Sequence, residues 1–314
     1  MAHASLSETP AWPAIDWQAP WFQAWAPLGQ PVHAAVMAGH SVADSLNQAA
    51  HPCGRTDLCF VPQSELPKGQ AYEAFIHAQQ RIPTRDNLHD FFNGLCWLRF
   101  GRSKRRLNQL QAQEIARQGV GQARGALRDA LTVFDENALL LQAPDGLWQA
   151  LCARDWQHLF VRERDQWAQV RIEVFGHALL EKLVQPYVAI TGHAWRVMPA
   201  PAPTAPIAGP NAQAKPTHSQ SHSQTQTQTQ TQSQSQSQSQ SQSQSQSPGV
   251  TNADVQHDAW LCDSLQEDLL RRKAFAPLPV LGVPGWWSAN QDPSFYAQTQ
   301  VFRAARTPDT DNLN

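Results

Sequence analysis

Residues 82–98 read IPTRDNLHDFFNGLCWL, a stretch that predicts a capped helix with an apolar side. Asp86 or Asn87 is a natural N-cap, because either side chain can accept a hydrogen bond from a free N–H of the first helical turn. From about Leu88 to Leu98, apolar residues recur at helical spacing. They are Phe91, Phe92, Leu95, Cys96 and Leu98. Cys96 sits among them, so we expect it to be a core residue.

Helical periodicity also dominates the chain on both sides of this stretch. Further helices are predicted at about 33–49, 103–118, 123–134, 148–151, 155–160, 163–184 and 258–273. Strands are few and short, with residues 58–62 and 139–142 fitting a strand and 72–76 fitting either a strand or a helix. The sequence therefore predicts an α+β fold that is mainly helical, in a single globular domain with a few short strands.

Residues 199–250 stand apart in composition, being Ala/Pro-rich at first and then alternating Ser or Thr with Gln. A stretch without large apolar side chains cannot repay the entropy cost of ordering, so we predict a disordered low-complexity insertion. The segment after it contains PLPVLGVPGWW at 277–287, which is apolar enough to need a core. We therefore expect residues 251–314 to pack back on the domain whose main part is residues 1–198.

The charge balance and the cysteines exclude several classes of protein. Lys and Arg number 24 against 26 Asp and Glu, a net charge of −2, so the chain as a whole is no polycation for nucleic acid or acidic membranes. The five cysteines include no CxxC pair, which argues against a disulfide framework or a zinc knuckle. Neither a secretory signal nor a run of about 18 apolar residues is evident. We expect a cytoplasmic protein with reduced thiols and no membrane contact.

One predicted helix carries acids and an imidazole at a spacing that suits a metal ion. Glu173, His177 and Glu181 follow one another at four-residue steps within 163–184, so all three project from nearly one face. Carboxylate and imidazole four residues apart are a recurrent way for a helix to offer two ligands to a divalent ion. The alternative is a plain hydrogen-bonded His–Glu pair, because no HExxH, EF-hand loop or Cys/His zinc pattern is present.

A second group of polar residues extends this metal hypothesis. His89 and Asp90 stand together near the start of the helix at 88–98, and Asp129 and Asp135 lie in a stretch without Lys or Arg. Such a cluster would suit Zn, Mn or Fe as cofactor, with a bound water acidic enough to attack an ester or a phosphodiester. In this hypothesis the ligands are His89, Asp90, His177 and Glu181, and Asp129 or Asp135 orients them or acts as base.

Two basic regions could take an anion. The loop 119–125 resembles a glycine-rich phosphate cradle and opens a helix that bears Arg124 and Arg128, although Gly119 as the C-cap of the preceding helix explains the loop more simply. The other region, 99–106, contains Arg102, Lys104, Arg105 and Arg106. Basic charge at a helix start opposes the helix dipole, so we expect an anionic partner, internal or external, and nucleic acid is one such partner.

Several short motifs, read together, carry a family resemblance. They are FVPQ (60–63), YEAFI (72–76), IPTRDNLHDFFNGLCWL (82–98), LNQLQ (107–111), RGALRDALTVFDEN (124–137), FGHALLEKL (175–183), PLPVLGVPGWW (277–287) and VFRAAR (301–306). In this order they resemble a proteobacterial family of unknown function, domain-of-unknown-function family 3025, over roughly residues 60–306. The resemblance implies a family without an assigned activity. The family pattern lacks so long a Ser/Gln insertion and has Gly where this chain has Ala138, which leaves open whether a tight left-handed turn follows Asn137.

Two classes of function remain open from these residues. The first is a metal-assisted hydrolase that uses the His/Asp/Glu cluster and a divalent ion. The second is a non-enzymatic binding or structural protein, in which the same polar residues form a buried network. In that case the 99–106 basic patch would contact nucleic acid or another anion.

Overall fold

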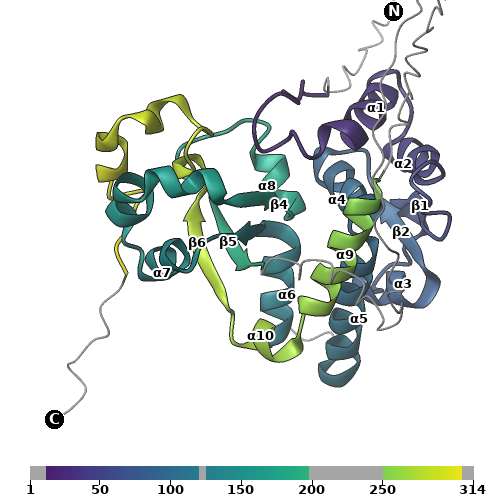
Figure 1. The fold of residues 1–314 in the computed structure, drawn as a ribbon. Coiled ribbons are helices and arrows are strands. Elements are labelled where there is room, and N and C mark those ends of the chain that lie inside the picture. The colour runs from purple at the N-terminus through teal and green to yellow at the C-terminus, as the bar shows by residue number, and fades with distance from the viewer. Residues whose placement is uncertain (1–11, 120–124, 198–249, 306–314) are drawn as a thin grey trace, which may run out of the picture. The chain divides into compact units, whose positions relative to one another are not determined.

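The structure is a computed structural model that describes residues 12–119, 125–197 and 250–305, most of which are helical (Figure 1). The helices before residue 198 are α1 (Ala26–Met37), α2 (Val42–Ala50), α3 (Tyr72–Gln79), α4 (Leu88–Arg99), α5 (Gly101–Gln118), α6 (Ala126–Asn137), α7 (Asp145–Ala153) and α8 (His177–Lys182). After residue 249 come α9 (Asn252–Ser264) and α10 (Glu267–Arg271). The predicted fold class, α+β and mainly helical, is confirmed.

Two small sheets accompany the helices. One consists of β1 (Cys59–Pro62) and β2 (Arg81–Thr84), which run parallel. The other has the strand order β4-β3-β5-β6, formed by β3 (Ala138–Gln142), β4 (Arg171–Val174), β5 (Thr191–Arg196) and β6 (Phe275–Pro279). β3 and β5 are parallel, whereas β4 and β6 are antiparallel to their neighbours. Since β6 follows the insertion, the segment after the insertion completes a sheet whose other strands come before the insertion.

Helix α4 lies at the centre of the core. Asn87 is its N-cap, and the side-chain oxygen accepts the Asp90 N–H at 2.8 Å. Every residue from Asp90 to Leu98 is buried. Gly94 allows α2 to pack closely, because a Cβ at this position would lie 2.1 Å from a methyl carbon of Leu46. The stretch that opens the sequence analysis therefore forms the helix on which its neighbours pack.

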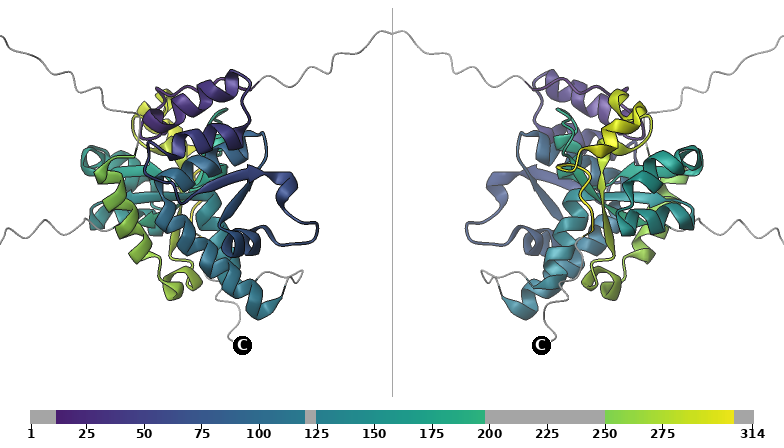
Figure 2. Two further views of the ribbon diagram at one scale, coloured as in Figure 1. Left: turned by 90° about the vertical axis from the view of Figure 1, so that its right-hand side faces the viewer. Right: turned by 90° about the vertical axis from the view of Figure 1, so that its left-hand side faces the viewer.

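Segments far apart in the sequence meet in this fold. Trp21, before α1, packs against Trp286 with 6.1 Å between ring centroids, so the C-terminal segment (yellow) lies beside the start of the described chain (purple) in Figure 2. Trp25 is fully buried, and its indole N–H donates to the carbonyl oxygen of Val174 at 3.0 Å. The N-terminal tryptophans therefore belong to the core that also covers the sheet.

The start of α5 is held by a carboxylate from the far side of the insertion. Asp258, on α9, is fully buried and accepts the backbone N–H groups of Arg102 at 2.8 Å and Ser103 at 2.9 Å. The Ser103 hydroxyl donates to the same carboxylate at 2.8 Å, and Arg55 donates at 3.3 Å. The N-cap residue itself, Phe100, has no polar side chain. The anionic partner expected at this basic helix start is therefore internal.

The prediction of one long helix at 163–184 is wrong. Arg164–Gln169 forms a 3-10 helix, Arg171–Val174 is strand β4, and only His177–Lys182 is α-helical. The physical reason is tertiary, since β4 pairs with β3 and this pairing overrides the local helical pattern. Glu173 consequently does not share a helix face with His177 and Glu181.

Other boundaries differ in smaller ways. The helix predicted at 33–49 is two helices, interrupted at Gly39, where φ is +97°. The helix predicted at 258–273 is α9 followed by α10, α5 begins at Gly101 rather than Ser103, and residues 155–160 lead into a π-helical turn. Strands β2, β5 and β6 were not predicted from the sequence, and β2 and β6 contain proline, a residue that argues against a strand. The disorder predicted for 199–250 falls on residues that lie outside the described ones except Val250.

Membrane spans and disulfides can be checked on the described residues. Within these ranges, no helix is both long and apolar enough to cross a bilayer. All five cysteines are free thiols. Cys96 is a core residue, as expected, and burial raises the pKa of its thiol.

Replacement of Asp258 should cost much of the stability of the fold. Asp258→Ala leaves the buried donors at the start of α5 without an acceptor, and we expect the free energy of unfolding to fall by about 3–5 kcal/mol. Urea unfolding followed by circular dichroism measures the change. Asp263→Ala, on the exposed side of the same helix, is the control and should change the free energy by less than about 0.5 kcal/mol. Equal effects of the two variants would contradict the capping role.

Candidate functional site

Two imidazoles from different helices meet at the centre of the site. His89 comes from the first turn of α4 and His177 is the first residue of α8. Their Nε2 atoms are 3.1 Å apart, and the rings are inclined at 80°. Glu181, one turn along α8, places Oε2 2.9 Å from Nδ1 of His89. Since His89 and Glu181 are about one-third exposed, this end of the site reaches the surface.

A close approach between α8 and the end of α6 brings a second carboxylate to the pair. Oδ2 of Asp135, in the last turn of α6, lies 3.7 Å from Nδ1 of His177. Gly176 makes this possible, because a Cβ there would lie 2.4 Å from the carbonyl oxygen of Glu136. The Gly176 N–H donates to the carbonyl oxygen of Ala138 at 2.9 Å. Ala138 itself is extended, with φ −72° and ψ 144°, so no left-handed turn follows Asn137.

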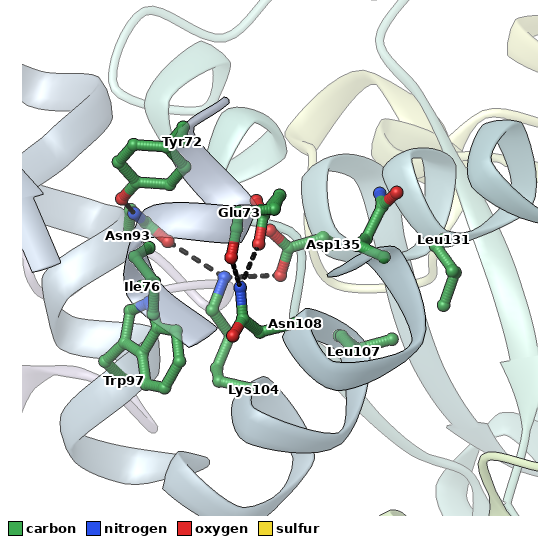
Figure 3. A pocket seen from close by; sticks show the side chains of 11 residues that line it. Tyr72, Glu73, Ile76, Asn93, Trp97, Lys104, Leu107, Asn108, Leu131 and Asp135 are labelled. Atoms are coloured by element: carbon green, nitrogen blue, oxygen red, sulfur yellow. Dashed lines mark hydrogen bonds and ion pairs between the residues drawn. The ribbon is translucent and has the colours of Figure 1, made fainter. Parts of the chain in front are cut away.

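Behind Asp135 lies a buried lysine, Lys104, from the first turn of α5 (Figure 3). Its ammonium group pairs with Oδ1 of Asp135 and donates to Oδ1 of Asn93 at 2.8 Å. The amide of Asn93 donates in turn to the hydroxyl of Tyr72 at 3.1 Å. The Lys104 ammonium also lies 5.6 Å from the ring centroid of Trp97. A chain of polar side chains therefore runs from Glu181, which is about one-third exposed, to Tyr72 through five helices. Its members are within hydrogen-bond distance of one another except His177 and Asp135, which are 3.7 Å apart.

A small cavity adjoins this chain. It is lined by Lys104, Asp135, Asn93 and Tyr72, together with Glu73 and Asn108, and the room left for water is about 20 Å³ (Figure 3). That is space for about one water molecule and not for an organic substrate. The amide of Asn108 donates to both the carboxylate and the carbonyl oxygen of Glu73. A larger ligand can therefore reach this chain only at the end where His89 and Glu181 are about one-third exposed.

Burial sets the protonation states along the chain. It lowers the pKa of His177 to about 3, so this imidazole is neutral at neutral pH. Burial would raise the pKa of Asp135, but the Lys104 ammonium and the imidazole of His177 outweigh it and hold that pKa below its usual value. The pKa of Glu73 is raised, chiefly by burial, and that of Tyr72 is raised well above its usual value for the same reason. Lys104 and Asp135 therefore form an ion pair beside His177, whose imidazole is neutral at neutral pH.

With one proton on each ring, the two imidazoles cannot satisfy all of their nitrogens. His89 needs a proton on Nδ1 to donate to Glu181, which leaves a lone pair on its Nε2. His177 must then donate from Nε2, and its own Nδ1 carries a lone pair that faces the Asp135 carboxylate. This buried Nδ1 makes no hydrogen bond of standard geometry with the described residues. The site therefore contains a polar atom whose partner requires either an extra proton or a cation between the Nε2 atoms.

Four of the six predicted metal and catalytic residues come together, namely His89, His177, Glu181 and Asp135. Asp90 faces away from them, because its carboxylate accepts the backbone N–H of Arg85 at 2.7 Å and pairs with the same guanidinium. Asp129 is half exposed and pairs with Lys273 on the surface. Over the described part of the chain, no three or more His, Cys, Asp or Glu side chains are grouped so as to hold a metal ion.

The predicted anion-binding residues do not form one free cationic surface. Lys104 is buried with Asp135, and Arg105 pairs with Asp57. Arg106 donates to Oε1 of Gln109 at 3.3 Å, and only the side chain of Arg102 is exposed without a partner among the described residues. Arg128, on α6, is partly buried, with a buried Nε that makes no hydrogen bond there. Arg124 and residues 120–123 of the glycine-rich loop lie outside the described residues.

The inner part of the site was not predicted from the sequence. Tyr72, Glu73, Asn93 and Asn108 were not proposed as functional residues, yet each belongs to the chain or lines its cavity. The signal that could have found them is their place in the motifs YEAFI, DFFNG and LNQLQ, which also supply the resemblance.

Comparison with known proteins gives one finding. A family model described as a protein of unknown function (DUF3025) matches residues 58–306. No curated protein and no solved structure matches the chain. The matched range contains all residues of the polar chain.

The glycine before His177 should be sensitive to a single methyl group. Gly176→Ala places Cβ against the backbone of Glu136 and Asn137, so we expect α8 to move and the free energy of unfolding to fall by about 1–3 kcal/mol. Thermal unfolding measures the loss, and NMR of the imidazole rings reports whether His177 leaves Asp135. Gly146→Ala in α7 is the control, because its Cβ meets nothing within 4 Å. It should leave stability unchanged or raise it by up to about 1 kcal/mol.

The buried carboxyl of Glu73 should weaken the fold at neutral pH. Because its pKa is raised above the usual 4.5, the folded chain holds the proton more tightly than the unfolded chain, and stability falls as the pH rises past 4.5. Glu73→Gln keeps an acceptor for Asn108 and cannot ionise. We expect it to raise the free energy of unfolding at neutral pH and to change it little below pH 4.5. Urea unfolding at both pH values tests this, and a loss of stability at neutral pH would count against it.

Proposed function

The chain belongs to the DUF3025 family of proteins of unknown function, and we propose that it is a metal-assisted hydrolase centred on His89 and His177. The observation that carries the proposal is the arrangement of the two rings. Their Nε2 atoms converge to 3.1 Å, while each Nδ1 faces a carboxylate, Glu181 on one side and Asp135 on the other. Metal-binding imidazoles in proteins have this arrangement of a carboxylate behind the ring.

A divalent ion held by His89 and His177 would remove this conflict, because each imidazole could then carry its proton on Nδ1 and donate it to Glu181 or Asp135. Lys104 supports this state, because it keeps the Asp135 carboxylate ionised.

Such an ion would supply a water acidic enough to attack the carbonyl carbon of an ester or the phosphorus of a phosphodiester. As the new bond to the water oxygen formed, the bond to the leaving ester oxygen would break, and that oxygen would take up the proton that the water gave up. Since His89 and Glu181 are at the half-exposed end, they supply the side from which such a substrate would enter.

The buried Lys104–Asp135 pair favours a second candidate, a non-enzymatic binding or structural protein. In this case the polar chain only specifies how the helices pack. Contact with nucleic acid or another anion through the 99–106 patch would then depend on Arg102, the member of that patch with an exposed, unpaired side chain among the described residues. We place the protein in the bacterial cytoplasm under either candidate, supported by its free cysteines.

Elemental analysis of untagged protein tests the metal proposal. We expect about one Zn, Mn or Fe ion per chain and hydrolysis of bis-p-nitrophenyl phosphate that a chelator abolishes. His177→Ala and the half-exposed His89→Ala should each lose the ion and the activity, because each removes one of two ligands. Asp129→Asn is the matched control and should keep both, since Asp129 pairs with Lys273 away from the imidazoles.

Two results together would contradict the hydrolase proposal and favour the structural candidate. The protein would take up no ion after reconstitution, and the His177→Ala variant would lose several kcal/mol of stability.

A further inference from the structure

A second cavity shares no lining residue with the one at Lys104. Its volume is about 340 Å³, within the range of small-molecule sites. It lies where the end of α7 meets strands β5 and β6 and the segment 300–303, elements that Figure 1 shows close together. Its lining includes Arg154, Trp156, Thr191, Pro277, Pro279 and Arg303.

The lining carries two guanidinium groups and no carboxylate. Among the described residues, the side chain of Arg154 makes no ion pair or hydrogen bond, and that of Arg303 donates only to the carbonyl oxygen of Gln300 at 3.2 Å. Arg154 is partly buried and Arg303 is exposed, whereas the more deeply buried Arg99 pairs with Glu173 and Asp254 at 2.9 Å each. The cavity therefore has unbalanced positive charge, and a guanidinium pairs best with a planar carboxylate or a phosphoryl group.

The backbone at Arg154 adds an independent observation. This residue ends α7 in the left-handed conformation, with φ 53° and ψ 34°, where glycine or asparagine is the usual residue. A long cationic side chain kept at such a position is strained, and strain of this kind gathers at binding sites.

An apolar floor completes the cavity. Thr191 pairs with Pro279 across the antiparallel strands β5 and β6, and Pro277 lies two residues before Pro279, so all three side chains project from the same face of the sheet. Trp156 closes one side, and its indole N–H donates to the carbonyl oxygen of Arg303 at 2.9 Å, which holds that segment in place. An apolar surface beside two arginines that lack carboxylate partners fits a ligand with an apolar body and an anionic end.

We propose that this cavity binds a small organic anion, with its carboxylate or phosphoryl group between Arg154 and Arg303 and its apolar part on Pro277 and Pro279. The proposal does not depend on the metal-assisted hydrolase. It also differs from the anion site expected at 99–106, where Lys104 pairs with Asp135 and Arg105 pairs with Asp57.

Isothermal titration calorimetry of the full chain tests the proposal with three probes. They are benzoate, phenylphosphonate, which cannot be hydrolysed, and inorganic phosphate. We expect saturable binding of benzoate or phenylphosphonate, the stronger of the two identifying the anionic group, and weaker binding of inorganic phosphate, which lacks the apolar part. Absence of saturable binding by both organic probes overturns the proposal, and equal affinity for phenylphosphonate and inorganic phosphate overturns the assignment of the apolar floor.

Variants separate binding from folding. Arg154→Gly suits the left-handed backbone, so the melting temperature should hold or rise while the affinity falls by about tenfold or more. Arg303→Gln should weaken binding to a similar extent. Arg81→Gln is the control, because Arg81 lies on β2 and pairs with Glu65, and it should bind as the unaltered chain does. Binding that persists in the Arg154→Gly, Arg303→Gln double variant would show that the probes bind elsewhere and overturn the assignment.

Discussion

The carboxylate of Asp258 at the N-terminus of α5 is the contact on which the candidate site depends. It satisfies the first free N–H groups of a helix whose opening turn carries Lys104. Lys104 keeps Asp135 ionised, and Asp135 faces the buried nitrogen of His177. A residue from beyond the insertion therefore controls, through two helices, the surroundings of an imidazole that is only 5% exposed. The site is thus a product of packing between distant segments, and no single motif contains it.

What could be predicted from the sequence was local. His177 and Glu181 lie one turn apart in α8, as predicted, even though a strand replaces the first part of the longer helix expected there. The cap and the apolar side of α4 likewise follow from its own residues. The contact of His89 with Glu181 could not be predicted, because 92 residues separate them and their pairing depends on how α8 docks on α4. Glu173 shows the same limit, since the β3 partner that draws it into a strand lies about thirty residues earlier.

The basic run at 99–106 shows why charge patterns alone do not identify a binding surface. The sequence of this run does not show whether its charges face water, a ligand or other residues of the protein. In the fold, carboxylates of the protein pair with most of its basic side chains. The two arginines that remain without a carboxylate beside the 340 Å³ cavity lie about 150 residues apart and form no run in the sequence. Only the fold brings them to one cavity.

The place of β6 also has a consequence for biosynthesis. This strand, like Asp258, comes after residues 198–249, so a ribosome must translate that whole stretch before β5 can gain its outer neighbour or α5 its cap. At about 5–20 residues per second the delay is on the order of several seconds. During this interval the nascent chain exposes an unpaired strand edge, and the time before the last sixty or so residues emerge is when it most needs protection from association with other chains.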